Sequence, residues 1–483
     1  MSLTRRLLGG TVQLTASSVL VKLMSVFSLP ILTALLSPKA YGGAALASTL
    51  ISLVAVVALG GIDMSYARAY PGYAGISQSS VEAFTWRYAL GTSALAGVVA
   101  ALAWWWLLAD RLAVGRYLAP LIGVGIVLAI GNTMSSTRAR LRGRYRHLAA
   151  AIILGGLLSV GVSLSVSWWW RQDELPLVLA LLVTYLVPIV VLGSPGIRQL
   201  LAPSGLASTQ RSDLLKIGLA GVVTAPMYWF LSSADRWFLG YFCDPDTVGI
   251  YSVAYNLAAL GAMANAAILA VWLPEAAREY EADPDLAQVQ LGRLMSRLIA
   301  GIALIWLAVT AAGGDLVRLL ANERFHEAGD YVGWIAGGVF FYGVMQFGSV
   351  GLLLSKRLGL AIVWWLLGGV VCVLLNLALI PRFGGLGAAI TQAATFAVVA
   401  GGVLGTSQRI YPMRLEWNGF VRTAVVVVVL GVVMAPSWHP LPVVSLLMKL
   451  PVGIAATLLI GHFSANDWLQ RGIIELHNRL GRV

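Results

Sequence analysis

Charged side chains inside long apolar segments are the residues of this sequence best suited to do chemistry. Lys22 lies near the middle of the apolar segment 11–36, and Asp235 and Arg236 are adjacent within the segment 213–242. A charged side chain at the centre of a membrane helix costs about 2.5–3.5 kcal/mol on insertion scales, so such groups usually face a cavity or a partner. Lys22 and Arg236 are therefore candidate contacts for an anionic substrate, and Asp235 is a candidate for substrate binding or ion coupling.

A polar stripe surrounds Lys22. Thr11, Thr15, Ser18, Lys22 and Ser25 follow one another at intervals of three or four residues. This spacing places them on one face of a helix. The face is expected to line a wet cavity or another helix, which makes Ser18 and Ser25 candidate substrate contacts. The alternative for Lys22 is a structural role, paired with a carboxylate or extended toward the membrane surface.

Asp235 and Arg236 cannot face each other on one helix, because adjacent side chains diverge by about 100°. Each is expected to meet another helix, or one of them lines the cavity while the other stabilises packing. Asp235 also completes a second polar face at helical spacing, formed with Thr224, Tyr228 and Ser232.

A further set of charges is predicted at the cytoplasmic mouth. Asp63 ends the second apolar segment, and Arg68 follows one turn later. A charge pair at the membrane surface is the simpler interpretation, and ion coupling by Asp63 is the alternative. Arginines also occupy every second position from 138 to 146, where Arg138, Arg140 and Arg142 could capture a phosphate. The simpler interpretation of this run is a signal for topology and for anionic lipids.

The composition defines the class of protein that carries these charges. The 483 residues are 59% hydrophobic and only 11% charged, with a mean hydropathy of +0.82. Apolar runs of 18 or more residues recur along the chain, as in spanning helices. The net charge of +12 is explained by cytoplasmic loops rich in Lys and Arg rather than by nucleic acid. An all-α polytopic membrane protein is predicted.

About 14 transmembrane helices are expected, arranged as six, six and two. The predicted spans are 11–36, 43–64, 83–108, 117–137, 147–170, 176–194, 213–242, 247–273, 293–313, 330–354, 358–380, 385–406, 419–436 and 441–463. The predicted parts are an N-terminal bundle (1–196), a cytoplasmic linker (197–212), a C-terminal bundle (213–406), two extra helices (407–463) and a cytoplasmic tail (464–483).

The two bundles are expected to be copies of one another. Pro38 and Gly42 match Pro245 and Gly249 in the same local pattern of turn and apolar run. An even number of helices per copy gives both copies the same orientation, with a pseudo-twofold axis along the membrane normal. Most Lys and Arg residues outside the spans fall on the side of the N-terminus, which predicts that both termini are cytoplasmic.

Catalytic signatures do not appear in the sequence. The five histidines are scattered without an HExxH motif, and the two cysteines, Cys243 and Cys372, form neither a disulfide framework nor a zinc site. We predict that the protein is not an enzyme and has no cofactor or metal, apart from a transport ion such as H⁺ or Na⁺.

These residues together resemble a family. The sequence resembles Wzx-type polysaccharide flippases at four places. These are Thr15–Ser18 leading to Lys22, the Ser37-Pro38 turn with Tyr41-Gly42, Asp235-Arg236, and Val248–Tyr251. Those proteins belong to the superfamily that also holds MATE exporters and the lipid II flippase MurJ (the MOP superfamily). The resemblance covers roughly the first 405 residues, and the last two helices resemble the extra pair of MurJ.

The resemblance implies two six-helix bundles in a V around a cationic cavity that opens alternately to each side of the bacterial inner membrane. The implied substrate is an undecaprenyl-diphosphate-linked oligosaccharide for O-antigen or exopolysaccharide assembly, moved from the cytoplasmic to the periplasmic leaflet. Lys22 and Arg236 are the implied cavity cations and Asp235 the implied coupling carboxylate. Implied partners are this glycan, membrane lipids and a glycan polymerase.

Three alternatives remain open: a MATE-like cation-coupled exporter, a MurJ-like lipid II flippase, and a membrane glycan polymerase. An exporter of cationic drugs should carry carboxylates and aromatic residues in its cavity rather than Lys22 and Arg236. A polymerase is expected to have a large periplasmic loop with basic and acidic groups, whereas the predicted outer loops here are short.

Overall fold

The computed structural model is a bundle of helices. It describes residues 3–72, 77–196, 198, 200, 205–219 and 224–463. The helices of the first half are α1 (Leu3–Leu35), α2 (Pro38–Leu59), α3 (Ile62–Ala69), α4 (Gln78–Ala103) with a π-helical turn (Trp104–Leu108), α5 (Leu118–Leu141), α6 (Tyr145–Trp169) and α7 (Leu175–Leu192). The others are α9 (Ser208–Leu219), α10 (Thr224–Phe242), α11 (Pro245–Ala258), α12 (Leu260–Ala282), α13 (Pro284–Leu320), α14 (Ala328–Gly348), α15 (Val350–Leu354), α16 (Ala361–Ile410), α17 (Trp417–Met434) and α18 (Pro442–Phe463).

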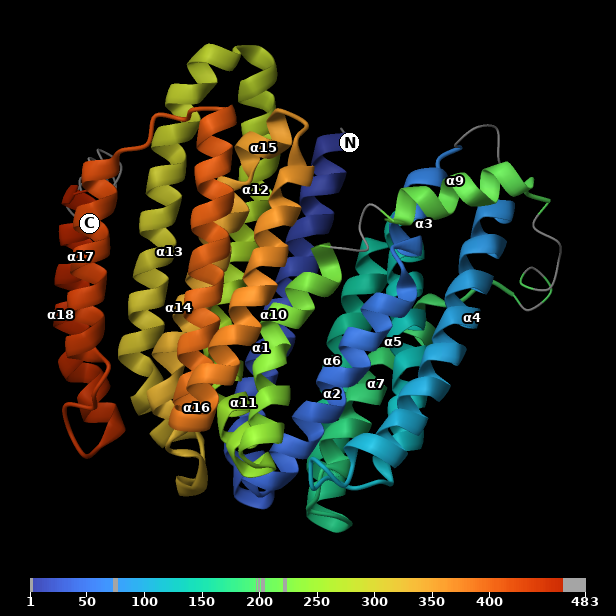
Figure 1. The fold of residues 1–483 in the computed structure, drawn as a ribbon, viewed down its shortest axis with the longest axis horizontal. Coiled ribbons are helices and arrows are strands. Elements are labelled where there is room, and N and C mark those ends of the chain that lie inside the picture. The colour runs from blue at the N-terminus through green and yellow to red at the C-terminus, as the bar shows by residue number, and fades with distance from the viewer. Residues whose placement is uncertain are drawn as a thin grey trace, which may run out of the picture. The chain divides into compact units, whose positions relative to one another are not determined.

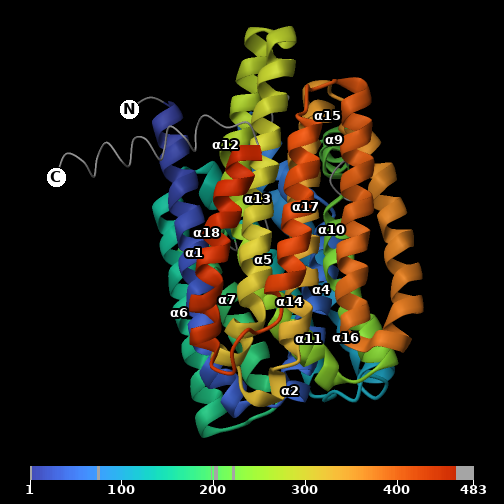
Figure 2. The same ribbon diagram turned by 90° about the vertical axis from the view of Figure 1, so that its left-hand side faces the viewer.

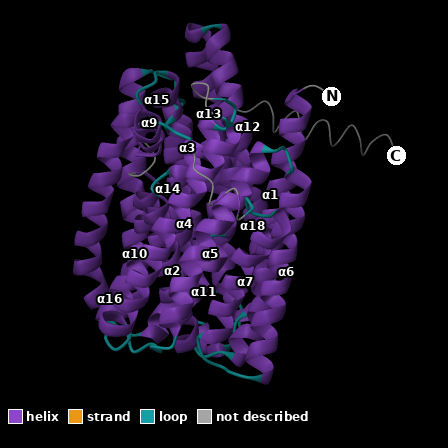
Figure 3. Cartoon of the chain, turned by 90° about the vertical axis from the view of Figure 1, so that its right-hand side faces the viewer, coloured by secondary structure: helices purple, strands orange, loops and turns teal. Residues whose placement is uncertain are grey.

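The predicted fold class is confirmed. Among the described residues the elements are helices and connecting loops, with no strand (Figure 3). Eleven helices in the described part of the chain are long and apolar enough to cross a membrane. In the absence of water, a helix satisfies all its backbone polar groups internally, which is why long apolar sequences take this form. The chain is a multi-pass membrane protein.

The predicted number of 14 spans is not established by this count, and three places explain the difference. Residues 358–410 count as one candidate span although α16 contains a bend, and the apolar part of α17, Val421–Met434, is short. The predicted span 213–242 divides into α9 and α10. α9 is too polar to cross a membrane: its exposed side chains include Arg211, Asp213 and Lys216.

The bend in α16 lies at Gly384, whose φ of 52° and ψ of −128° are not helical. Glycine reaches this region without steric cost because it has no Cβ. Fifty residues of straight helix would extend about 75 Å, more than twice the roughly 30 Å hydrocarbon core. The bend divides α16 into two arms, each long enough for one crossing.

The chain forms two compact units: residues 1–252 with 380–385, and residues 253–379 with 386–483. The predicted division at 196 and 213 rests on the sequence repeat and stays a prediction. Part of the predicted linker (197, 199 and 201–204) and the whole predicted tail (464–483) lie outside the described residues.

In the first unit, α6 packs on α1 and α7, and α5 packs on α2, α4 and α7. α2 begins at Pro38, a residue suited to the first helical turn, and Ser37 caps it by accepting a hydrogen bond from the Ala40 amide. α9 lies across α3 (Figure 1). Ser65 of α3 donates a 2.5 Å hydrogen bond to the Leu214 carbonyl, and Gly218 approaches the Gly61 backbone.

In the second unit, α13 is the central helix. It packs on α12, α14, α17 and α18. α12 and α13 form a hairpin that extends beyond α14, α17 and α18 (Figure 2). The segment 411–416 between α16 and α17 is fixed to α13: Tyr411 donates a hydrogen bond to the Pro284 carbonyl at 2.7 Å.

Candidate functional site

Lys22 on α1 and Arg236 on α10 are brought together by the fold. The two side chains lie close enough for the positive charge of Arg236 to act on that of Lys22. Lys22 is half-buried, whereas Arg236 is buried, with a relative exposure of 6%. Two neighbouring cations repel each other, and the repulsion is strong where little water screens it. Such a pair gains from an anion that binds both.

Asp235 and Arg236 both contact α11. Tyr251 donates a short hydrogen bond to Asp235 Oδ2, and Arg236 Nε donates to Ser252 Oγ at 3.4 Å. The Arg236 guanidinium lies 5.7 Å from the centre of the Tyr251 ring, and its Nη1 donates to the Ser232 carbonyl at 3.1 Å. The pair therefore belongs to a buried polar cluster that joins α10 to α11.

Ser18 and Ser25 are exposed on α1, on the same face as Lys22. Their hydroxyls donate to carbonyls of their own helix, Ser18 to Leu14 at 3.0 Å and Ser25 to Lys22 at 2.8 Å. Hydroxyls that donate to their own helix need no wet cavity to be satisfied. Their lone pairs remain available as acceptors. The side chains of Thr11 and Thr224 are outside the described residues.

Asp63 lies in the first turn of α3, half-buried, rather than at the end of the preceding helix. Within the described chain no ion pair joins it to Arg68, which is exposed. Burial raises the pKa of Asp63 above its ordinary value, and the charge of Arg140 partly opposes this rise. The cation that acts on Asp63 is therefore Arg140, from the arginine run.

Glu82 binds two other arginines of the run, Arg138 and Arg142, and its role was missed from the sequence. This α4 carboxylate is only 3% exposed. Arg138 Nε donates to it at 2.6 Å, Arg142 Nη2 donates at 3.2 Å, and the Tyr66 hydroxyl donates at 2.9 Å. The guanidinium groups of Arg138 and Arg142 are thus bound to an internal partner that joins α3, α4 and α5.

A second buried ion pair lies in the second unit and was also missed. Lys449 of α18 is 3% exposed and donates to Asp315 Oδ2 of α13 at 2.7 Å. Ser437 and Ser445 donate to the same carboxylate at 2.6 and 2.8 Å, and Lys449 donates to the Ala311 carbonyl at 2.8 Å. The cluster therefore attaches α18 and the connection that precedes it to α13.

Three cavities beside α13 have volumes of about 210, 410 and 320 Å³. The first two lie along α17 and the third lies against α18. None of the predicted site residues lines them. Among the described residues, no group of three His, Cys, Asp or Glu side chains could hold a metal ion.

Comparison with solved structures identifies the fold. A structure described as the lipid II flippase MurJ in an inward closed conformation is similar, with a TM-score of 0.69 at 12% identity, covering 97% of this chain and 100% of that chain. An inward-facing MATE family multidrug transporter of the MOP superfamily has a TM-score of 0.59 at 13% identity, covering 83% and 95%. A MATE transporter of Vibrio cholerae has a TM-score of 0.52 at 13% identity, covering 84% and 97%. The fold is that of the transporters and flippases of this superfamily.

The sequence also matches a family. A family model described as "Polysaccharide biosynthesis protein" matches residues 31–320. The chain belongs to that family. No curated protein matches the chain. The resemblance to polysaccharide flippases of the MOP superfamily is confirmed.

Proposed function

We propose that this protein moves an undecaprenyl-diphosphate-linked oligosaccharide from the cytoplasmic to the periplasmic leaflet of the bacterial inner membrane. The observation that carries the proposal is membership of a polysaccharide biosynthesis family, in a chain whose apolar segments hold two cations, Lys22 and Arg236, with Arg236 buried. A diphosphate is an anion that two neighbouring cations can share through charge-assisted hydrogen bonds. Its polyprenyl tail stays in the hydrocarbon, whereas its head needs a polar path.

In the proposed cycle, Lys22 and Arg236 hold the diphosphate, and Ser18 and Ser25 offer acceptor lone pairs to hydroxyls of the head group. Alternating access then exposes the head to each leaflet in turn. Both termini lie in the cytoplasm, and a glycan polymerase would use the delivered substrate for surface polysaccharide. The protein itself performs no catalysis.

Coupling to H⁺ or Na⁺ is assigned to Asp235, with Asp63 as the second candidate. Asp235 is 2% exposed and accepts a hydrogen bond from Tyr251. Protonation of Asp235 would remove its attraction for Arg236 and free this cation for the substrate. A change of one charge beside the binding site is a direct way to link ion movement to substrate affinity.

The test is complementation of a strain that lacks the gene by Lys22→Ala and Lys22→Arg, with Lys216→Ala on exposed α9 as the matched control. Lys22→Ala should reduce flipping of the lipid-linked glycan at least about tenfold, as expected for a lost charge-assisted contact. Lys22→Arg should retain more activity because it keeps the charge. Full flipping by Lys22→Ala, present at normal amounts, would remove Lys22 from the anion site.

A MurJ-like lipid II flippase is the second candidate, because the similarity to the MurJ structure extends over 97% of the chain. Both candidates move a polyprenyl diphosphate, so identification of the lipid-linked precursor separates them. A MATE-like exporter of cationic compounds is disfavoured, since two neighbouring cations would repel its substrate. A glycan polymerase is the least favoured alternative.

A further inference from the structure

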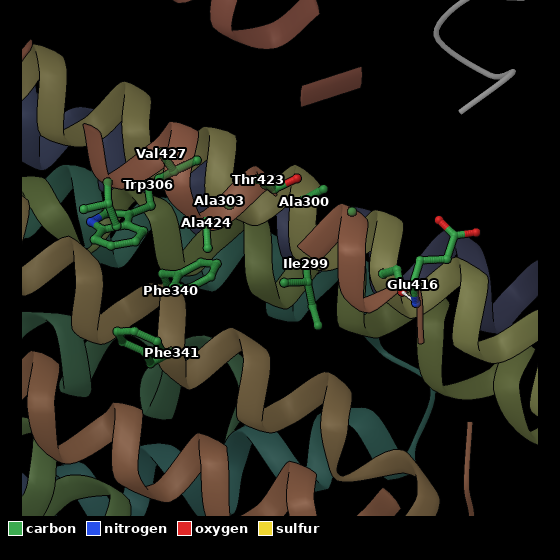
Figure 4. A pocket seen from close by; sticks show the side chains of 13 residues that line it. Ile299, Ala300, Ala303, Trp306, Phe340, Phe341, Glu416, Thr423, Ala424 and Val427 are labelled. Carbon is green, nitrogen blue, oxygen red and sulfur yellow. Dashed lines mark hydrogen bonds between the residues drawn. The ribbon is translucent and has the colours of Figure 1, made fainter. Parts of the chain in front are cut away.

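An apolar slot lies between α17 and the helices α13 and α14 (Figure 4). Its first cavity, of about 210 Å³, is lined by Ile299, Trp306 and Phe340 on one side and by Val427 of α17 on the other. A second cavity, of about 410 Å³, shares Trp306 and Val427 with the first and continues along α17. The two cavities therefore form one slot along α17.

The first cavity has Glu416 at one end. Glu416 lines this end, as Figure 4 shows, with Trp306 toward the other end. The Glu416 amide donates to Ser296 Oγ at 3.2 Å, and the neighbouring Arg414 amide donates to the Gln288 carbonyl at 3.1 Å. The backbone before α17 is thus held against α13. No ion pair among the described residues involves the Glu416 carboxylate.

A buried hydroxyl lies deeper in the same cavity. Thr423 lines it and is only 4% exposed, and its Oγ1 has no hydrogen-bond partner within the described structure. Threonine in a helix commonly donates to a carbonyl one turn earlier. A buried hydroxyl without a partner is costly, so an acceptor from a bound molecule would stabilise this position.

The depth of the first cavity corresponds to one leaflet. Twelve residues separate Glu416 from Val428, which is about 18 Å along a helix. Half of the roughly 30 Å hydrocarbon core is about 15 Å. In a helix that crosses the membrane, a cavity of this length fits one leaflet, which would place Glu416 at head-group level, Thr423 below it and the apolar part at the depth of an acyl chain.

We propose that this slot binds one glycerophospholipid with a primary ammonium head group, of the phosphatidylethanolamine class. The ammonium donates to the Glu416 carboxylate, an ester carbonyl accepts from Thr423 Oγ1, and one acyl chain lies against Trp306 and Phe340. A trimethylammonium head group has no N–H to donate, and an anionic head group is repelled by Glu416. The site is separate from the proposed transport site and does not depend on it.

Native mass spectrometry of the purified full-length protein tests this proposal by measuring which lipids it retains. The protein is stripped of lipid and then exposed to vesicles of phosphatidylethanolamine, phosphatidylcholine and phosphatidylglycerol with identical acyl chains. Wild type should retain the ethanolamine lipid about fivefold over the other two, the size expected of a partly exposed charge pair. Glu416→Gln should abolish the preference, and the exposed control Glu323→Gln should keep it. Ala424→Trp, which fills the slot, should reduce retention of all three lipids.

A second measurement keeps the proposal testable if Glu416→Gln fails to fold. Lipids with brominated acyl chains should quench the fluorescence of Trp306. The Trp306 signal is identified as the fluorescence that is lost in Trp306→Phe. The ethanolamine lipid should quench this signal at a lower concentration than the choline lipid. Equal retention and equal quenching by all head groups would overturn the proposal, as would preferential retention of a polyprenyl phosphate.

Discussion

Gly42 of α2 and Gly249 of α11 each contact the first turn of the other's helix. A Cβ added to Gly42 would lie 1.8 Å from the Pro245 carbonyl oxygen, and one added to Gly249 would lie 1.9 Å from that of Pro38. Reciprocal contacts of this kind are the mark of a two-fold axis. The four residues are those that match in the predicted sequence repeat, and the reciprocal contact supports that prediction. The missing side chains let the two backbones approach closely, as small residues do in membrane helices.

Substitution of either glycine tests this crossing. Gly42→Ala should destabilise the protein by about 1–3 kcal/mol or more, because the new methyl group must displace a backbone carbonyl. Gly249→Ala should cost a similar amount because the contact is reciprocal. The measurement is thermal unfolding in detergent. Gly161→Ala on α6 is the matched control, since a Cβ there meets nothing within 4 Å. A Gly42→Ala protein that melts with the control would contradict the close contact.

The Asp315–Lys449 pair gives a second prediction. Lys449→Met should destabilise the protein by about 3–5 kcal/mol, because it leaves the buried Asp315 carboxylate without its cation. The double variant with Asp315→Leu should recover most of this loss. Arg278→Ala, which breaks the exposed pair with Glu275, should cost less than about 1 kcal/mol. Unfolding of the wild type, both single variants (Lys449→Met and Asp315→Leu), the double variant and Arg278→Ala under the same conditions decides the matter, and additive single effects in the double variant would refute the coupling.

The buried Glu82 carboxylate gives a third prediction. Glu82→Gln should destabilise the protein by roughly 3–5 kcal/mol, since it removes the charge that pairs with Arg138 in a buried position. Arg146→Ala, at an exposed position of the same arginine run, should change stability by less than about 0.5 kcal/mol. If Glu82→Gln left stability unchanged, the arginines would not depend on this carboxylate and capture of phosphate would regain support.

The half-buried Asp63 carboxyl makes the stability of the protein depend on pH. Burial raises the pKa of this carboxyl, so the stability it contributes is present below its unfolded pKa and is lost as the pH rises through its folded pKa. Asp63→Asn has no such charge. The variant should therefore unfold at a higher temperature than wild type at neutral pH, and the difference should shrink on acidification. A difference that stays constant with pH, or grows on acidification, would contradict this assignment.

The sequence predicted the class of fold and the deep charges, but not their partners. Apolar runs report helices directly, and Lys22, Asp235 and Arg236 are conspicuous because charge is rare in such runs. Glu82 was missed because it lies just before the predicted start of its span, at residue 83, whereas α4 begins at Gln78. Lys449 pairs with a residue 134 positions away, and a contact at that separation leaves no local pattern. The division of 213–242 into α9 and α10 also depends on tertiary packing, through the contacts of α9 with α3.

The most direct test of the proposed function is the identity and leaflet of the lipid-linked glycan in cells from which this protein has been removed. Depletion should cause an undecaprenyl-diphosphate-linked oligosaccharide to accumulate on the cytoplasmic leaflet while surface polysaccharide is lost. Wild type should reverse the accumulation and Lys22→Ala should not. Cells that still display their surface glycan, accumulate no precursor and become sensitive to drugs would contradict the account and identify an exporter.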